Sequence, residues 1–451
     1  MGKPTIDTVE KETLALTSKA AGRLRPEKVE DKNRPTRILF LTDSFSPHAG
    51  GSREYYYNIL RELVALGGAE VVVLTKKVPG WELFDQKHSS SVSFRIRRRF
   101  KPLKSYKYGE LPKGILPFFQ ALWRTWRDSP EIIHAGDLYP PGLIAWIINK
   151  VTGIPYVIYS HGEEITQTDR FRYQPRARDR IYKGAAIVIA NSEFTRKQLL
   201  RIGVSEDHIV KITPAVDADR FRAEPPDEEL KRQYNLNSKT VILTVARLVP
   251  RKGHRAALQA FAGVCREFPE SHYLIAGTGP EEPKLRQFVE QLGIQGRVTF
   301  TGYVASETLP NLYNLCDIML LANREEADGD VEGFGIVFLE ANAAGKPVIG
   351  GRSGGAIEAV ADGVTGRLVD PDSSIELETA LRELLSDPQL RQTMGVDGRR
   401  RVESEFNWKQ RAQSLDGLNR RILYNPVQAS RPQPLRRSRL DFRRRPEEGS
   451  R

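Results

Sequence analysis

The sequence predicts an α/β protein with two doubly wound domains, each built around a parallel β-sheet. A strand, a loop and a helix follow one another at residues 37–63, and the same order returns at residues 241–261. After both starts, short apolar strands alternate with helical stretches, which is the pattern of repeated βαβ units. The chain has 451 residues, 39% of them hydrophobic, which is enough to form two ordinary cores.

Each half of the chain contains four further stretches that we expect to be strands. They are AEVVVLT, EIIHA, PYVIYS and AAIVIAN in the first half, and SHYLIAG, RVTFTG, DIMLLA and KPVIGG in the second. Residues 216–237 hold two prolines and many charges, so they are expected to form a linker. The resulting division is a polar N-terminal extension (1–35), a first domain (36–215), the linker, a second domain (238–405), an amphipathic helix (406–424) and a basic, disordered tail (425–451).

Composition limits the kind of protein. The two cysteines, Cys265 and Cys316, form no CxxC pair, which argues against a zinc knuckle or a disulfide framework and fits a reducing compartment. The N-terminus lacks the apolar core of a signal peptide, and no apolar run reaches the roughly 20 residues that span a bilayer. We therefore expect a cytoplasmic protein, with peripheral attachment to a membrane as an option.

The net charge of +12 is unevenly distributed. Residues 95–107 carry seven basic side chains and no acid, and residues 431–451 carry eight arginines against three acids. Such patches suit an anionic lipid surface or a nucleic acid, and the ordinary alternative is a solvated face and a disordered tail. Because the sequence has no nucleic-acid-reading motif, we expect a membrane surface and no nucleic acid.

Ligands of doubly wound sheets bind at the carboxyl ends of the strands, so the loops there should carry the chemistry. One such loop leads into a predicted helix with the sequence DVEGFGIVFLEANAAG, at residues 330–345. The backbone N–H groups of Gly333 to Ile336 should lie at the helix N-terminus, which attracts phosphate. Glu340 follows about one turn later in apolar surroundings, where the hydroxyls of a ribose would satisfy its carboxylate. Glu332 would face a second hydroxylated group. The alternative is a buried glutamate satisfied by backbone amides.

Two weaker signals lie at other predicted strand ends, and a third lies in the same loop as Glu332. Arg247 and Lys252 could neutralise a diphosphate, although surface cations are common. His161, in the first domain, could bond a sugar hydroxyl or an acceptor, although a lone histidine is more often structural. Asp328 and Asp330 form a DGD triplet, which we expect to be a solvated turn rather than a metal site.

Taken together, these residues resemble glycosyltransferase family 4, the retaining enzymes of the GT-B fold with two Rossmann-like domains facing across a cleft. The resemblance covers roughly residues 37–424. It is carried by the Glu332-x7-Glu340 spacing around a GFG turn, by Arg247 with Lys252, by Gly50-Gly51 in the first loop and by His161 in SHG. Within the family, the motifs DVEGFGIVFLEANA, SGGAIEAV and YSHGEE are most similar to bacterial phosphatidylinositol mannosyltransferases.

The resemblance implies a role for each of these residues. Arg247 and Lys252 would stabilise the departing diphosphate, Glu332 would hold the transferred sugar, and Glu340 would hold the ribose. The remaining contacts would be made by Gly50 and Gly51 (diphosphate and acceptor), His161 (transferred sugar), the backbone at Val304 (base), and Gly333, Phe334, Gly335 and Ile336 (backbone contacts to sugar and phosphate). No metal or other cofactor would be required.

The resemblance also implies GDP-mannose or a UDP-sugar as donor and a lipid-linked or glycan acceptor. Glu163 stands where these mannosyltransferases often have a second histidine, and residues 166–184 are rich in arginine, so the acceptor remains open. Three alternatives remain. They are a UDP-sugar-dependent glucosyl- or N-acetylglucosaminyltransferase, a sugar-nucleotide epimerase, and a non-catalytic protein that binds membranes or nucleic acids.

Overall fold

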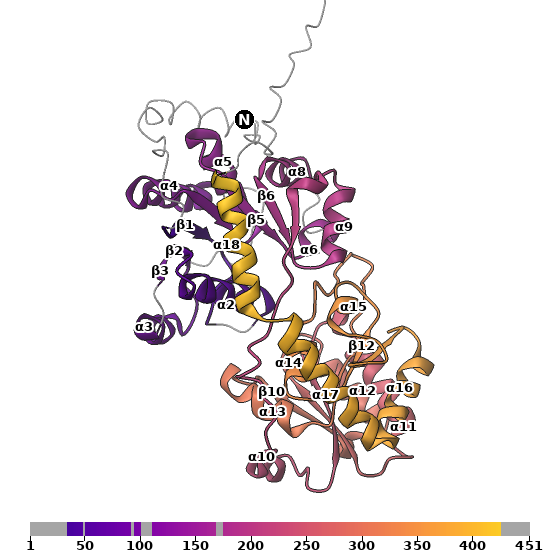
Figure 1. Ribbon diagram of the computed structural model, residues 1–451. Helices are drawn as coiled ribbons and strands as arrows, with labels where there is room; N and C mark the ends of the chain where they lie inside the picture. Colours follow the sequence, from indigo (N-terminus) through magenta and orange to yellow (C-terminus); the bar gives the residue numbers. More distant parts are fainter. Residues whose placement is uncertain (1–33, 48–49, 92–93, 101–110, 168–174, 425–451) are drawn as a thin grey trace, which may run out of the picture.

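A computed structural model describes residues 34–47, 50–91, 94–100, 111–167 and 175–424 (Figure 1). Residues 1–33 of the expected extension and the basic tail at 425–451 lie outside the described residues. Residues 101–107, half of the expected basic segment, lie outside them as well. No helix of the described part is long and apolar enough to cross a membrane.

The first domain contains a seven-stranded, all-parallel sheet with the strand order β3-β2-β1-β4-β5-β6-β7. Its strands are β1 (Thr36–Leu41), β2 (Ala69–Lys76), β3 (Arg95–Phe100), β4 (Ile132–Ala135), β5 (Tyr156–Ser160), β6 (Ile187–Ala190) and β7 (Ile209–Lys211). Its helices are α2 (Gly51–Ala65), α3 (Trp81–Ser91), α4 (Leu111–Asp128), α5 (Leu143–Thr152), α6 (Glu163–Thr166), α8 (Pro175–Gly184) and α9 (Glu193–Arg201), with short turns η2 (Leu138–Gly142) and η3 (Glu206–His208).

The second domain contains a six-stranded parallel sheet with the order β10-β9-β8-β11-β12-β13. Its strands are β8 (Thr240–Val245), β9 (Ser271–Ala276), β10 (Val298–Gly302), β11 (Ile318–Leu321), β12 (Val348–Gly351) and β13 (Gly366–Val369). Its helices are α11 (His254–Val264), α12 (Glu282–Gln291), α13 (Leu309–Leu315), α14 (Ile336–Ala343), α15 (Ala356–Ala359), α16 (Ser374–Ser386) and α17 (Pro388–Glu405), with short turns η4 (Pro250–Lys252), η5 (Gln295–Arg297) and η6 (Ser306–Thr308).

Both faces of each sheet are covered, which explains why the strands are apolar without alternation. In β1, Ile38 and Phe40 join one buried cluster, while Leu39 and Leu41 join another on the opposite face. The prediction of two doubly wound α/β domains is confirmed. A short helix, α10 (Glu228–Gln233), interrupts the stretch expected to be a linker, with Asp227 as its N-cap.

The sequence analysis missed three strands, β3, β7 and β13, all of which lie at or near sheet edges. Two of them are only three or four residues long, and β3 reads RIRRRF, which has the composition of a charged surface. Within β3, Arg98 is buried and its Nε lies 2.9 Å from both carboxylate oxygens of Asp85. One cation of the expected basic patch therefore faces the protein and is unavailable to a membrane.

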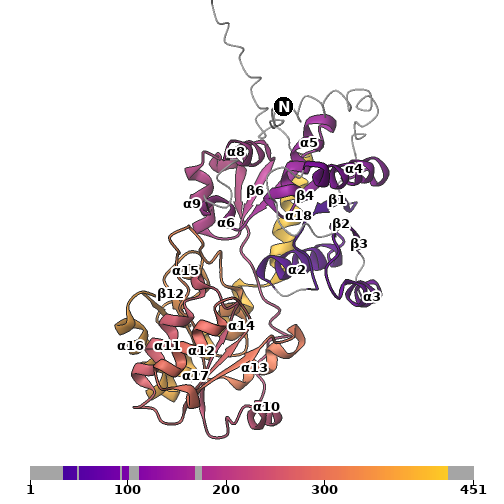
Figure 2. The same cartoon turned by 180° about the vertical axis from the view of Figure 1, so that it is seen from behind.

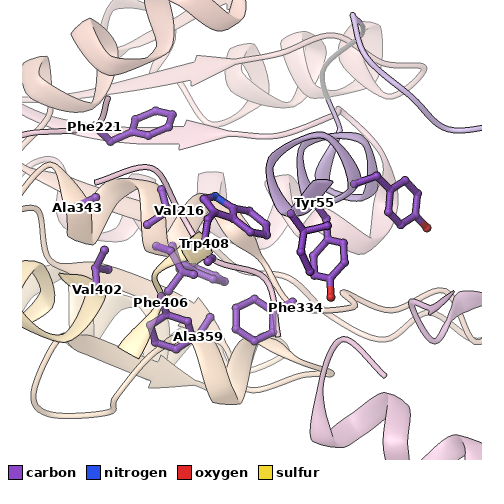
Figure 3. Packing of buried hydrophobic residues seen from close by; sticks show 14 of the residues in the cluster. Tyr55, Val216, Phe221, Phe334, Ala343, Ala359, Val402, Phe406 and Trp408 are labelled. Atoms are coloured by element: carbon purple, nitrogen blue, oxygen red, sulfur yellow. The ribbon is translucent and has the colours of Figure 1, made fainter. Parts of the chain in front are cut away.

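The chain crosses between the domains twice, and the two crossings lie side by side. The backbone N–H of Val216 on the outward path donates to the carbonyl of Phe406 on the return path, at 3.1 Å. The expected last helix is present as α18 (Trp408–Tyr424), which lies along the first domain although it follows the second (Figure 1). There the Trp408 ring packs against Tyr55 of α2, with ring centroids 5.6 Å apart (Figure 3).

Candidate active site

The glycine turn before α14 is anchored at the junction of the two domains. The Phe334 side chain is buried, and its ring lies 6.0 Å from that of Phe406, where the chain returns to the first domain (Figure 3). Gly335 has φ +88°, a left-handed conformation that favours glycine, and α14 begins at the next residue. The first N–H groups of α14 have no partner within the helix, so they form an anion-attracting end.

Glu332 is buried in an ion cluster rather than standing free in its loop. Its Oε2 accepts from Lys252 Nζ and, at 3.0 Å, from Arg251 Nη1. Arg251 also lies 3.2 Å from Asp330, and the side chains of Arg251 and Lys252 are each buried. Burial alone would raise the pKa of Glu332, but the charges of Lys252 and Arg251 outweigh it and lower this pKa to about 2. Glu332 is therefore an anion at any working pH, and it holds Lys252 in place.

Glu340 meets different surroundings one turn into α14. Its Oε2 accepts a 2.7 Å hydrogen bond from the phenol of Tyr313 on α13. Burial raises the pKa of Glu340 to about 7; the hydrogen bond from Tyr313 and the charge of Arg220 oppose this rise, and the charge of Glu54 adds to it. The partner of Oε2 is thus a phenol, and Oε1 has no hydrogen-bond partner among the described residues, so it is available for a ligand hydroxyl.

Arg247 is exposed at the end of β8. Its guanidinium has no hydrogen-bond or ion-pair partner among the described residues. Its backbone carbonyl accepts a hydrogen bond from His254 Nε2 at 3.0 Å. Arg53, in the first turn of α2, is close enough for the two charges to interact. Cations of both domains therefore gather beside the N-terminus of α14, where a diphosphate would be stabilised.

His161 is held by its own domain. Its Nε2 lies 2.6 Å from the hydroxyl of Tyr56, which itself donates to the carbonyl of Gly136, so Nε2 carries the proton. Nδ1 then accepts from Asn191 Nδ2 at 3.4 Å. Burial lowers the pKa of His161, and the imidazole is neutral. Both ring nitrogens are thus engaged in this structure, and a sugar contact through one of them would displace Asn191 or Tyr56.

The structure brings most of the predicted site residues together across the domain boundary. A Cβ at Gly333 would lie 2.7 Å from the carbonyl oxygen of His161, so only glycine allows this approach. A Cβ at Gly51 would lie 3.6 Å from the Ile336 side chain, which places the loop of Gly50 and Gly51 against the start of α14. Each of these two glycine loops therefore contacts the other domain, Gly333 at His161 and Gly51 at Ile336.

Val304 lies on the loop after β10 and is half-buried. Arg220 connects this loop to the rest of the site, because its Nη2 donates to the carbonyl and the hydroxyl of Ser306, at 2.6 Å each. Its Nη1 lies 3.9 Å from Glu54 of α2. The loop that carries Val304 is therefore connected through Arg220 to α2 of the first domain.

Several residues of the site were not found by sequence reasoning. Arg251 and Asn191 carried a signal, because Arg251 adjoins Lys252 and Asn191 is the last residue of a predicted strand. Asp137, after β4, also follows a strand, and its Oδ2 accepts from the Thr42 hydroxyl at 2.6 Å and from the Asp43 N–H at 2.7 Å. Tyr56 and Tyr313 lie inside helices, where an aromatic residue usually signals only a core position.

The DGD triplet packs against the first domain. A Cβ at Gly329 would lie 2.2 Å from the carbonyl oxygen of Thr166 in α6. Within the described residues, no group of three or more His, Cys, Asp or Glu side chains could hold a metal ion.

Two family models match the chain in succession. Residues 49–220 match the Glycosyltransferase Family 4 domain, and residues 226–401 match the Glycosyl transferases group 1 domain. The chain is 31% identical over 386 residues to a GDP-mannose-dependent alpha-(1-6)-phosphatidylinositol monomannoside mannosyltransferase of Mycolicibacterium smegmatis, covering 84% of this chain and 97% of the relative. It is 27% identical over 394 residues to the Corynebacterium glutamicum enzyme that acts on the monoacylated form, covering 85% and 97%.

Two solved structures share the fold. Anabaena HepE in complex with UDP-glucose has a TM-score of 0.71 at 22% identity, covering 85% of this chain and 98% of its own. Sucrose-phosphate synthase from Thermosynechococcus elongatus has a TM-score of 0.73 at 24% identity, covering 86% and 99%. The two family models and the 31% identical relative select a glycosyltransferase over the epimerase and the binding protein. The chain belongs to the GT-B glycosyltransferases that join a family 4 domain to a group 1 domain, and it is an enzyme that transfers a sugar from a nucleotide sugar.

Proposed function

We propose that the enzyme transfers mannose from GDP-mannose to a lipid-linked or glycan acceptor, with retention of the anomeric configuration. The observation that carries this proposal is the buried Glu332–Lys252–Arg251 cluster beside the N-terminus of α14, opposite Gly51 and His161 of the first domain. Such a cluster supplies a fixed anion for sugar hydroxyls and fixed cations for a diphosphate. The mannosyltransferase relatives at 31% identity favour mannose as the sugar.

In the proposed reaction, the bond between the sugar C1 and the diphosphate breaks, and a bond forms from C1 to the acceptor oxygen on the same face. The departing diphosphate takes the proton of the acceptor hydroxyl. Lys252, Arg247 and the N–H groups of α14 stabilise the negative charge that develops on it, and each such preorganised donor is worth about 3 kcal/mol. Glu332 holds hydroxyls of the transferred sugar, Glu340 holds the ribose, and the backbone at Val304 borders the base. The mechanism requires no metal, because side chains supply the positive charge.

The proposal extends to an anionic membrane surface as the place where a lipid-linked acceptor is met. On α4, three aromatic side chains at helical spacing are exposed: Phe119 (52%), Trp123 (39%) and Trp126 (66%). Arg127 adds an exposed cation, 5.2 Å from the Trp123 ring, and Arg95 is exposed on β3. Aromatic rings with basic neighbours favour the headgroup region of an anionic bilayer.

A donor panel tests the proposal. The full chain is incubated with GDP-mannose, UDP-glucose and UDP-N-acetylglucosamine, with lipid and oligosaccharide acceptors, and released nucleoside diphosphate is measured. Release from GDP-mannose is expected, and release only from a UDP-sugar would refute mannose as the sugar. A nucleotide at 100 times its Kd should also stabilise the fold by about 2.7 kcal/mol. Proton NMR of the first product tests retention, since an inverted anomeric centre would refute it.

Membrane attachment has a separate test, because transfer to a soluble glycan would not require it. Co-sedimentation with vesicles of anionic and of neutral lipid should show preference for the anionic ones, weakened by salt. Exchange of Phe119 and Trp126 for serine should reduce binding. Equal partitioning to both kinds of vesicle would refute the membrane surface and favour a soluble acceptor.

A further inference from the structure

The two domains meet at a second place, beside the active site. There α15 of the second domain lies next to the N-terminus of α9 of the first domain, in both views of the molecule (Figures 1 and 2). Glu358 of α15 makes the contact. One of its carboxylate oxygens accepts from the backbone N–H of Glu193, the first residue of α9, and the other lies 2.8 Å from Lys211 Nζ. A carboxylate at a helix N-terminus is also favoured by the helix dipole.

The contact is tied to the active-site loop of the second domain. The N–H of Gly355, in the turn before α15, donates to the carbonyl of Glu332 at 2.9 Å. A Cβ at Gly355 would lie 2.0 Å from the carbonyl oxygen of Gly333, so the two turns are in direct backbone contact. At the other end of α15, Arg401 donates to the carbonyls of Glu358 and Ala359, at 2.8 Å each. The position of Glu358 is therefore fixed relative to the loop of Glu332 and Gly333.

On the first domain, the contact is tied to His161. Asn191, two residues before Glu193, donates a hydrogen bond to His161. A Cβ at Gly333 would lie 3.0 Å from the Nδ2 atom of Asn191. The hydroxyl of Thr195 in α9 donates to Asn191 Oδ1 at 2.7 Å. The start of α9 and the loop of His161 therefore form one hydrogen-bonded unit, and Glu358 holds that unit from the other domain.

A pocket borders the contact on this side of the boundary. A cavity of about 690 Å³ lies behind the contact, lined by Lys211, Glu358, Arg401 and Arg411 among others. Ile357, next to Glu358, is 51% exposed. At the edge of this pocket, the polar bonds of Glu358 connect the two domains directly.

We propose that Glu358 is a positioning residue. Its bonds to the N–H of Glu193 and to Lys211, here called the clasp, hold the first domain against the second. The clasp thereby sets the closed arrangement in which His161 meets the loop of Glu332 and Gly333. The chemistry lies elsewhere, and Glu358 touches no reacting atom. The proposed donor contacts of Arg247, Lys252 and Glu340 all lie within the second domain. Most of the proposed donor contacts therefore form without the clasp, whereas transfer needs the first domain.

The test is steady-state kinetics of the full chain with GDP-mannose, together with small-angle X-ray scattering of the same proteins without ligand. Glu358→Ala removes both bonds, and kcat should fall about tenfold with little change in the donor KM. Glu358→Gln keeps an acceptor for Glu193 N–H, and Lys211→Met removes only the cation, so each should lower kcat about threefold. The radius of gyration should rise most for Glu358→Ala.

A double-mutant cycle distinguishes the effect of losing the clasp on kcat from the effect of a general loss of stability. Because Glu358→Gln and Lys211→Met remove the same ion pair, the double variant should be no slower than either single variant. The matched control is Glu383→Gln, which removes an ion pair with Arg367 of similar exposure inside the second domain and should leave kcat and the scattering unchanged. The melting temperature of each variant is recorded to confirm that it is folded.

Three results would overturn the proposal. They are additive losses in the cycle, a donor KM that rises while kcat is kept, and an unchanged radius of gyration for Glu358→Ala. Should GDP-mannose not be a donor, the scattering experiment still decides whether Glu358 holds the domains together. The failure of the proposed donor would then remain distinguishable from the failure of the clasp.

Discussion

The two carboxyl groups on either side of the Gly333–Gly335 turn have opposite electrostatic environments. Glu332 is in contact with two buried cations, and its pKa is lowered to about 2 although burial alone would raise it. Glu340 has the phenol of Tyr313 as its hydrogen-bond partner, and burial raises its pKa to about 7. The turn thus separates a permanent anion from a carboxyl group that titrates near neutrality.

This difference indicates what each region can do. The Glu332 region is complete in the absence of ligand, because the anion orients Lys252 before a diphosphate arrives, and such preorganisation is what lowers a barrier. The Glu340 region has an unused carboxylate oxygen and a charge that depends on pH, which suits a group that binds and releases ribose hydroxyls. The first region should therefore control turnover, and the second should control donor affinity.

The largest expected effect is that of Lys252→Ala. Loss of this cation should lower kcat at least about a hundredfold, because it would stabilise the departing diphosphate. The fold should survive, since Arg251 still pairs with Glu332. Steady-state kinetics and a melting curve check this, with Lys239→Ala as the control. Lys239 pairs with Glu270 just before β8, at the opposite end of the sheet from the site. A near-normal kcat in folded Lys252→Ala would remove Lys252 from the mechanism.

Glu332→Gln should also lower kcat at least about a hundredfold, since the amide neither holds Lys252 nor accepts two sugar hydroxyls as a carboxylate does. Because Glu332 and Lys252 act as one unit, the double variant should be only slightly slower than either single variant. The control is Glu270→Gln, which breaks the Lys239 pair. Independent, multiplying losses would contradict the shared role that the buried pair implies.

Donor affinity should depend on pH through Glu340. Its pKa of about 7 lies above the ordinary value of 4.5, so the carboxylate form is lost as the pH falls through 7. The ionised fraction falls about eightfold between pH 7.5 and pH 6, and the donor KM should rise by a similar factor. The same shift has the opposite sign for the unliganded fold, because stability from this group is present below pH 4.5 and is lost as the pH rises through 7.

Two variants serve as controls for this pH profile. Glu340→Gln should have weak, pH-independent donor binding. Tyr313→Phe removes the hydrogen bond that favours the carboxylate form, so the acid limb of the profile should move to higher pH. An acid limb that persists in Glu340→Gln would assign the titration to another group.

The smallest expected effect is that of chelation. Arg247, Lys252 and the N-terminus of α14 would supply the positive charge that a metal ion supplies in other transferases, so activity should be unchanged in EDTA. Transfer is measured before and after dialysis against EDTA, with Mg²⁺ or Mn²⁺ added back. Loss of activity that either ion restores would place a required metal in the reaction.

The comparison also shows where sequence reasoning reaches its limit. The period of apolar strands and helices predicts both sheets, and the Glu332-x7-Glu340 spacing locates the turn between the domains, because both patterns are local in the chain. The partners of the two acids are not local. Tyr313 is 27 residues from Glu340, and Arg251 is 81 residues from Glu332, so only the fold shows that one acid meets a phenol and the other two cations. The edge strand β3 was missed because its sequence has the composition of a charged surface, and β7 and β13 were missed because they are only three and four residues long.

The central claim is that the two acids hold two different parts of one nucleotide sugar. Titration calorimetry of the wild type, Glu332→Gln and Glu340→Gln with GDP and with GDP-mannose tests it most directly, because GDP contains the ribose and lacks the transferred sugar. Glu340→Gln should weaken the binding of both ligands by a similar factor, whereas Glu332→Gln should weaken GDP-mannose more than GDP. If Glu340→Gln left the affinity for GDP unchanged, or if Glu332→Gln weakened both ligands equally, the assignment of the two carboxylates would be wrong.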